Sequence, residues 1–235
     1  MDVIIPHCSE SYWESQELRY CLRSIEKNFK DLGNVYIHGY CPPFVKNVIH
    51  NPIEYTYESK GARIIAKLLY ACNNPNVSSD YLFIADDNCF LKPMGREDIK
   101  PYYTYDMKGE SLRKGNKLWM QCLRNTRRTL LKEKLPCFNH EPHTPLIINK
   151  NAFKKVMAKY DWINTLYPTF SLYFNNILSV HEQLPPDYRV FYDKEGADLN
   201  LIEGKSFLAY NDLGLSSKLQ FKLADLFPMK SRFEK

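Results

Sequence analysis

Short apolar runs alternate with amphipathic patterns along the first part of the chain. The run Val3–Pro6 predicts a short buried strand that ends at a proline. Apolar side chains then recur at helical spacing, and they are Leu18, Leu22, Ile25 and Phe29. Ser11 with Glu14 offers a capping box ahead of this helix, and Gly33-Asn34 stops it. With a second strand expected at Val35–His38, the chain opens as β-α-β.

The next stretch repeats this alternation. An extended piece is expected at Ile53–Tyr57. A helical apolar face follows, made of Gly61, Ile64, Ile65, Leu68, Leu69 and Cys72, and Asn73–Asn76 ends it. The unbroken apolar run Tyr81–Ala85 is typical of a central parallel strand covered on both faces, and it leads directly into Asp86-Asp87-Asn88. Strands that alternate with helices predict an α/β fold with an open, mostly parallel sheet flanked by helices.

The later part of the chain has a weaker pattern. Residues 95–135 show little periodicity, which favours a surface insertion over core. A strand is expected at Pro145–Ile148, followed by a helix that Asn151 caps and whose apolar stripe is Phe153, Val156, Met157 and Tyr160. A further helix is expected at Leu172–His181, and a last amphipathic helix runs to Phe227 before Pro228.

Composition excludes several classes of protein. The 235 residues are 44% hydrophobic and 25% charged, which is an ordinary globular balance. No apolar run approaches the ~18 residues that span a bilayer, and the N-terminus lacks the basic region of a signal peptide. The seven cysteines form no C-x-x-C pair, so we expect a reducing, cytoplasmic setting. Neither a P-loop nor a G-x-G-x-x-G motif occurs, which argues against P-loop NTPases and Rossmann dehydrogenases.

The net charge of +5 is unevenly distributed. The segment from Lys108 to Lys134 contains nine basic and two acidic residues, a local net charge of +7. The net charge of the remaining chain is therefore −2. This basic segment has two interpretations. It is an amphipathic helix with an ordinary solvated face, or it is a platform for an anionic acceptor such as nucleic acid, whose phosphates Lys and Arg contact regardless of sequence.

The first place to look for chemistry is Asp86-Asp87-Asn88. Ligands of open α/β sheets bind beyond the carboxyl ends of the strands, and these residues follow an apolar strand directly. Two carboxylates and an amide are hard oxygen ligands suited to Mg²⁺ or Mn²⁺, which in turn hold a diphosphate. Taken alone, the same residues also fit a simple turn at the end of a strand.

The order of these segments resembles the GT-A nucleotide-sugar glycosyltransferases. The similarity lies in the opening strand, in the helix that begins at Lys60-Gly61, and in the apolar strand that ends in a D-x-D-like motif. It implies a metal ion at Asp86 and Asn88, with Asp87 turned toward the sugar. It also implies a nucleotide-binding loop after the first strand, at Pro6 and His7. Asn88 replaces the second Asp of the motif, which lowers the expected metal affinity.

Cations are needed where the donor phosphates sit, and Arg19, Lys60 and Arg63 are the candidates, although each also fits a solvated helix face. A narrower similarity, over Glu17–Asn28 and the terminal Phe227–Glu234, is to Stealth-type sugar-phosphate transferases. That resemblance implies an alternative reaction in which a sugar phosphate is transferred and a nucleoside monophosphate is released.

Histidine and glutamate residues form two further candidate clusters. In His140–Pro145, proline excludes a helix. GT-A members often complete the metal site with a late histidine, which implies a role for His143 as ligand or beside the acceptor. An inverting transferase also needs a base, and Asp87, His143 and Glu182 are the candidates. Surface imidazoles and a helix-end His181-Glu182 pair are the structural alternatives.

Together these observations predict one GT-A-like catalytic domain over residues 1–235. Residues 1–94 are expected to form its nucleotide-sugar-binding half, 95–135 a basic insertion, and 136–235 the acceptor-side half. The predicted activity is metal-dependent transfer of a sugar from a nucleotide sugar to an acceptor hydroxyl on a glycan or on a hydroxylated DNA base. The alternatives are the sugar-phosphate transferase and a non-catalytic protein that binds nucleic acid through residues 108–134.

Overall fold

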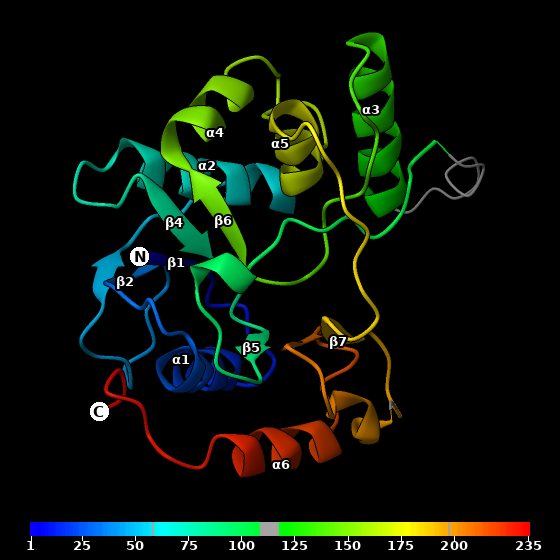
Figure 1. Ribbon diagram of the computed structural model, residues 1–235. Helices are drawn as coiled ribbons and strands as arrows, with labels where there is room; N and C mark the ends of the chain where they lie inside the picture. Colours follow the sequence, from blue (N-terminus) through cyan, green and yellow to red (C-terminus); the bar gives the residue numbers. More distant parts are fainter. Residues whose placement is uncertain (58, 109–117, 197) are drawn as a thin grey trace.

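A five-stranded sheet forms the centre of the fold (Figure 1). The computed structural model describes residues 1–57, 59–108, 118–196 and 198–235. The strand order is β3 (Ile49–Asn51), β2 (Val35–Gly39), β1 (Val3–His7), β4 (Asp80–Phe83) and β6 (Leu146–Asn149). The first four strands are parallel, and β6 runs antiparallel to β4 at one edge. The predicted mostly parallel α/β sheet is therefore confirmed.

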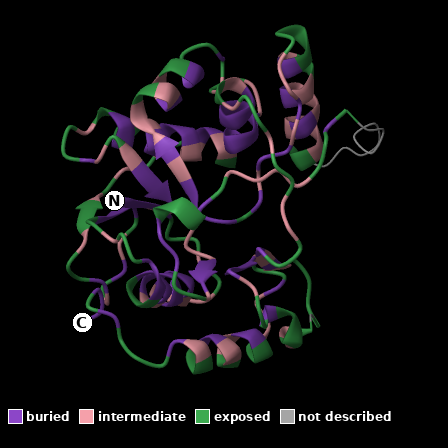
Figure 2. Cartoon of the chain, viewed as in Figure 1, coloured by how far each residue is buried: buried purple, intermediate pink, exposed green. Residues whose placement is uncertain are grey.

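Helices cover both faces of this sheet. Alternation along β1 sends Ile4 to one face and Val3 and Ile5 to the other, and the two faces belong to separate cores. The Ile4 side is covered by α2 (Lys60–Asn73), α4 (Lys150–Met157) and α5 (Thr169–Ile177). The opposite side is covered by α1 (Gln16–Asn28). Figure 2 shows the inner strands mostly buried and the outer helix surfaces exposed, whereas the edge strand β3 is largely exposed.

A second, smaller sheet lies beside α1, and the sequence did not predict it. Its strands are β5 (Asn88–Phe90), β8 (Phe207–Tyr210) and β7 (Arg189–Tyr192), in that order. It packs with α6 (Ser217–Leu226) in a third core that includes Leu208, Leu219 and Leu223. Two short 3₁₀ helices, η1 (Arg96–Asp98) and η3 (Leu199–Ile202), lie in the connections. β4 and β5 thus belong to different sheets, separated by a turn at Asp86-Asp87.

The predicted basic insertion contains a helix, α3 (Leu118–Lys132), that stands beside α5 (Figure 1). Its Leu123 and Leu130 are buried in the core that α2 and α5 share, so α3 packs on the fold through an apolar face. Arg113, Lys114 and Lys117 lie outside the described residues. In the part of the chain that the structure describes, no helix is long and apolar enough to cross a bilayer. All seven cysteines are free thiols.

Several local expectations were wrong. The extended piece predicted at Ile53–Tyr57 is an irregular segment, and the strand precedes it at Ile49–Asn51 because Pro52 cannot donate to a ladder. Asn149, rather than Asn151, caps α4, and its side chain accepts the Ala152 N–H at 3.0 Å. The helix expected to reach His181 ends at Ile177.

The prediction of a capping box for α1, from Ser11 and Glu14, was also wrong. Ser15 occupies the N-cap position with no side-chain cap hydrogen bond. The Ser11 hydroxyl instead accepts the N–H groups of Trp13 at 3.1 Å and Ser15 at 2.7 Å, and it donates to Glu17 at 2.8 Å. Ser11 therefore orders the loop ahead of the helix rather than the helix end itself.

The C-terminus is tied to α1 by a buried ion-pair cluster. The side chain of Glu234 is fully buried and accepts hydrogen bonds from Arg19 at 2.5 Å and from Arg23 at 2.7 Å. The Arg19 guanidinium also lies over the Phe44 ring at 4.1 Å. Burial would raise the pKa of the Glu234 carboxyl, but the bonds from Arg23, Ser231 and Arg19 outweigh it and lower this pKa to about 2.

Removing the Glu234 charge should destabilise the fold. We expect Glu234→Gln to lower the free energy of unfolding by about 3 kcal/mol at pH 7, because two largely buried guanidinium groups lose their anion. The lowered pKa means that this stabilisation is present above about pH 4.5 and is lost as the pH falls toward 2. Urea denaturation at pH 7 and pH 3 measures both effects. The exposed Glu203→Gln variant is the control, and equal stability of the two variants would contradict this role.

Candidate functional site

The carboxyl edge of the central sheet brings His7 and Asp86 together. Because β1 and β4 are parallel, with Ile4 opposite Phe83, both strands end at the same edge. His7 closes β1, and its Nδ1 lies 2.5 Å from Asp86 Oδ2. A carboxylate only accepts hydrogen bonds, so Nδ1 carries the proton and donates it. His7 is 2% exposed, whereas the Asp86 side chain is 28% exposed, so the carboxylate faces solvent from a buried support.

A third side chain completes this arrangement from the start of α1. His7 Nε2 lies 3.0 Å from Ser15 Oγ, and in the tautomer that carries its proton on Nδ1 this nitrogen accepts from the serine hydroxyl. Ser15 is buried and sits in the left-handed region, with φ 61°. This chain of hydrogen bonds fixes the orientation of Asp86 from two separate elements.

Asp87 and Asn88 lie differently from the prediction. Asp86 and Asn88 were expected on one side of a continuing strand, but the turn at Asp86-Asp87 interrupts it, and Asn88 opens β5. Asn88 is 2% exposed, and its Nδ2 donates to Asp87 Oδ1 at 2.7 Å. Burial, and next the neighbouring Asp86 charge, raise the pKa of Asp87 to about 7, while the Lys60 charge opposes the shift. Asn88 thus supports Asp87 directly.

His143 reaches the same edge from the antiparallel strand. Phe83 of β4 lies opposite Leu146 of β6, so residues just after β4 and just before β6 meet at this edge. The His143 ring stacks on Phe191 at 4.4 Å. His143 is exposed as a whole residue, but Phe191 covers one face of its ring. Desolvation of the ring, and next the charges of Arg189 and Lys60, lower the pKa of His143 to about 4, so its imidazole is neutral at pH 7. The Lys60 charge acts on both Asp87 and His143, so both lie within electrostatic range of the N-terminus of α2.

Lys67 was not predicted as a site residue, although it interrupts the apolar face of its helix. Its ammonium group is largely buried and donates to the His7 carbonyl oxygen at 2.8 Å. Burial lowers the pKa of Lys67, and the nearby Cys8 and Asp86 oppose this shift. Gly39, with φ 117°, leaves room for the contact, because a Cβ there would lie 2.1 Å from the His7 oxygen and 2.5 Å from Nζ. Arg63 is close enough for its charge to act on Lys67.

Other predicted site residues have contacts elsewhere. Arg19 is held by Glu234. Pro6 lies within β1 opposite His38. Glu182 is exposed, and its backbone carbonyl accepts the Tyr103 N–H at 2.9 Å.

In the predicted His140–Pro145 cluster, His140 and Glu141 make structural contacts, and His143 lies near the candidate site. His140 Nε2 lies 2.9 Å from His181 Nδ1, and His140 Nδ1 donates to the Pro101 carbonyl at 2.8 Å. Glu141 Oε1 accepts the N–H groups of Phe170 and Ser171, each at 2.8 Å, at the start of α5. Only His143 of this cluster shows an electrostatic link to Lys60.

The few protein oxygen atoms at this edge fit a metal ion that its substrate also helps to hold. Within the described ranges, no three side chains of His, Cys, Asp or Glu converge on one point. Asp86 Oδ1 and Asn88 Oδ1 accept no hydrogen bond from the described residues. Mg²⁺ is commonly bound through one or two carboxylates together with phosphate oxygens and water, which matches a set of few protein oxygens.

Solved structures include a protein with a similar fold. An active-site mutant of LgtC, a GT-A glycosyltransferase, aligns with 99% of this chain and 98% of its own, with a TM-score of 0.54. The chain has a GT-A-like fold. The two sequences are only 9% identical, so this match establishes the fold alone. Any conclusion about the reaction must come from the side chains of this chain. No family model matches the chain, and no curated protein matches it by sequence.

The buried histidine pair should make stability depend on pH. Burial, and next the neighbouring His181, lower the pKa of His140 to about 4. The unfolded chain therefore binds more protons than the native chain between about pH 6.5 and 4. His140 contributes full stability above this window and loses it as the pH falls. We expect His140→Gln to flatten the dependence of the free energy of unfolding on pH in this range.

Urea denaturation in half-unit pH steps measures that dependence. The exposed His50→Gln variant is the matched control and should keep the wild-type slope. An unchanged slope in His140→Gln would show that its imidazole does not remain neutral in the folded protein.

Proposed function

We propose that the chain transfers a sugar from a nucleotide-sugar donor to an acceptor hydroxyl in a metal-dependent reaction. The observation that carries this proposal is the Asp86-Asp87 pair, which His7 and Asn88 hold at the carboxyl edge of a GT-A-like sheet. Open α/β sheets bind their ligands at this edge. Cleavage of the bond between sugar and diphosphate develops negative charge on the leaving phosphate, which the groups at this edge must stabilise.

Asp86, Asn88 and His143 are the proposed metal ligands. Asp86 has an oxygen free for an ion, and Asn88 Oδ1 is unused by the described residues. His143 lies at the same edge, and its lowered pKa keeps it in the neutral form that binds metals. A divalent ion bound here would supply Lewis-acid stabilisation to the diphosphate.

Cationic side chains at the start of α2 complete the donor site. Lys60 is exposed at the first turn of the helix, where backbone N–H groups also favour phosphate. Arg63 lies one turn further along α2. Arg189 adds a guanidinium whose buried Nε has no hydrogen-bond partner within the described residues. We assign the donor diphosphate to these three residues, and they replace Arg19, which Glu234 occupies.

Asp87 is the proposed base for the acceptor hydroxyl. It is a carboxylate that Asn88 holds at 2.7 Å, directly beside the proposed metal ligands, where an acceptor hydroxyl would meet the donor sugar. Glu182, the other carboxylate candidate, is exposed and contacts Tyr103 through its backbone.

Asp86→Ala tests the proposal directly. We expect wild-type protein to be stabilised against heat by a nucleotide sugar together with Mn²⁺, because ligands that bind the folded state raise Tm. Asp86→Ala should lose this shift, and its turnover should fall at least about 100-fold. The exposed Asp212→Ala variant is the control. A fully active Asp86→Ala variant would refute the proposal, and release of a nucleoside monophosphate instead of a diphosphate would identify a sugar-phosphate transferase.

His7 should act as a positioning residue for Asp86. His7→Ala removes the donor to Asp86 Oδ2, and loss of such a supporting hydrogen bond commonly weakens metal affinity about 10- to 100-fold. Electron paramagnetic resonance of Mn²⁺ titrated into the protein measures that affinity. His7→Asn, which keeps a short donor, should recover part of it. Equal Mn²⁺ affinity in wild type and in a folded His7→Ala variant would contradict this role.

A further inference from the structure

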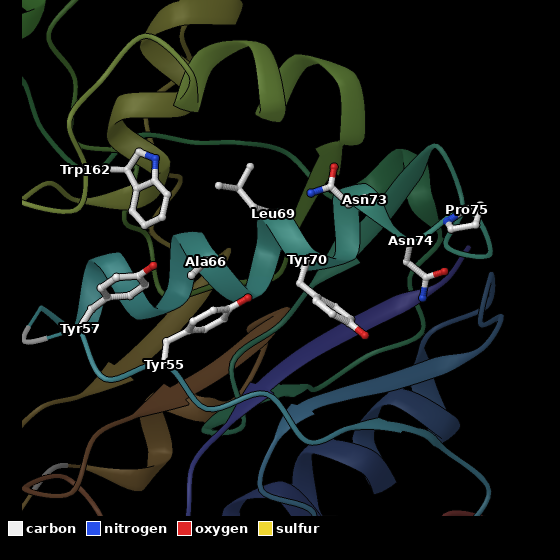
Figure 3. Close-up of a pocket in the computed structure, with 9 residues that line it drawn as sticks. All are labelled: Tyr55, Tyr57, Ala66, Leu69, Tyr70, Asn73, Asn74, Pro75 and Trp162. Carbon is white, nitrogen blue, oxygen red and sulfur yellow. The ribbon is translucent and has the colours of Figure 1, made fainter.

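An open pocket of about 500 Å³ lies along α2, on a face that the donor site does not use (Figure 3). Four aromatic side chains dominate its lining, namely Tyr55, Tyr57, Tyr70 and Trp162. Tyr55 and Tyr57 precede the helix, Tyr70 projects from it, and Trp162 comes from the segment after α4. The size is typical of small-molecule sites, so the pocket has room for a ring-shaped ligand.

The aromatic rings present faces in more than one direction. Tyr55 and Tyr57 stack at 5.6 Å with an interplanar angle of 15°. Trp162 stands nearly perpendicular to Tyr57, at 5.8 Å and 85°. Tyr70 is 41% exposed, and its ring is nearly perpendicular to that of His38, with the ring centroids 5.4 Å apart. A ligand with a flat apolar face can pack against these rings while its edges stay in water.

The polar ends of these side chains are available to such a ligand. Within the described residues, the hydroxyls of Tyr55, Tyr57 and Tyr70 and the Trp162 indole N–H make no hydrogen bond. Asn73 and Asn74 add amide groups at the far end of the pocket. The pocket therefore combines stacking faces with a ring of donors and acceptors.

Among the residues that the structure describes, the lining carries no charged side chain. Strands of nucleic acid are held through their phosphates by Lys and Arg, with bases stacked on aromatic rings, and this pocket offers only the second of these features. A neutral ring with apolar C–H faces and hydroxyl edges matches every feature of the lining. That description fits a pyranose unit.

The position on α2 relates this pocket to the donor site. Ala66, Leu69, Tyr70 and Asn73 line the pocket from one side of the helix. Lys60, Arg63 and Lys67 follow one another at helical spacing on an adjacent side, which faces the carboxylates. Tyr57 lies just before Lys60, so the pocket begins at the same end of the helix as the donor site and extends away from it.

We propose that this pocket is an acceptor subsite that binds a pyranose ring of a neutral glycan. The acceptor role rests on the proposed glycosyl transfer, with the bound sugar remote from the hydroxyl that reacts at Asp87. The pocket anchors the glycan along α2 and increases the local concentration of its reactive end at the donor site.

Direct binding tests this assignment without requiring turnover. The probes are neutral hexasaccharides of glucose, mannose, galactose and N-acetylglucosamine, titrated by saturation-transfer NMR into the full chain without donor. We expect at least one of them to bind, and Tyr70→Ala and Trp162→Ala to weaken its affinity at least about tenfold. Trp162→Phe, which keeps an aromatic face, should retain most of the affinity. Tyr12→Ala removes a tyrosine that is 87% exposed outside the pocket and should change nothing.

Two results would overturn the subsite. One is the absence of binding by all four hexasaccharides, and the other is binding that Tyr70→Ala and Trp162→Ala leave unchanged. Binding of a single-stranded oligothymidine that these variants abolish would assign the pocket to nucleic acid instead. The thermal shift with nucleotide sugar and Mn²⁺ should remain in Tyr70→Ala. Failure of the donor site would appear in that shift, whereas failure of the subsite would appear only in glycan binding.

Discussion

The His7 imidazole is the contact on which the candidate site depends. It ends the central strand β1, accepts from Ser15 at the start of α1, and donates to Asp86 beyond β4. Both ring nitrogens are used, so a rotation of the ring would break two hydrogen bonds in a buried position. The parallel register of β1 and β4 brings these groups to one edge, and the imidazole then sets the direction in which the Asp86 carboxylate faces. Lys67 also holds His7 in place, because its ammonium group donates to the His7 carbonyl oxygen.

The adjacent carboxylates at this edge support the proposal of a bound cation. Asp86 and Asp87 are adjacent carboxylates, and burial together with the Asp86 charge raises the pKa of Asp87 to about 7. Lys60 opposes that shift only partly. A divalent ion would offset the repulsion between the carboxylates, and its diphosphate ligand would in turn meet the cations at the start of α2. The proposed donor site would therefore have alternating layers of charge, each of which is stabilised by the next.

Local patterns in the sequence were sufficient to predict the core of the central sheet and the helices beside it. The runs at Val3–Pro6, Val35–His38 and Tyr81–Ala85 lie in β1, β2 and β4, because buried parallel strands are apolar on both faces. The second sheet escaped prediction since its strands have three or four residues and pair over long distances in the sequence, as Asn88 does with Ala209. The partner of Arg19 is likewise 215 residues away, so no local signal could identify it. The position of Asp86-Asp87-Asn88 after an apolar strand marked it as a candidate site. The turn that separates Asp86 from Asn88 could not be predicted in the same way, because it depends on the pairing of β5 with β8.

In the proposed reaction, α2 serves both the donor and the acceptor through two of its three sides. Its apolar side, with Ile65, Leu68 and Cys72, is fixed in the core that also holds α4 and α5, so the helix is a rigid reference for the other two sides. The cationic side meets the carboxylates of the sheet edge, and the aromatic pocket occupies the remaining surface. Because side chains on one helix keep fixed relative positions, a ligand held in the pocket is placed relative to the donor site without any loop movement. Rigid placement of this kind lowers the entropic cost of bringing an acceptor to the reacting centre.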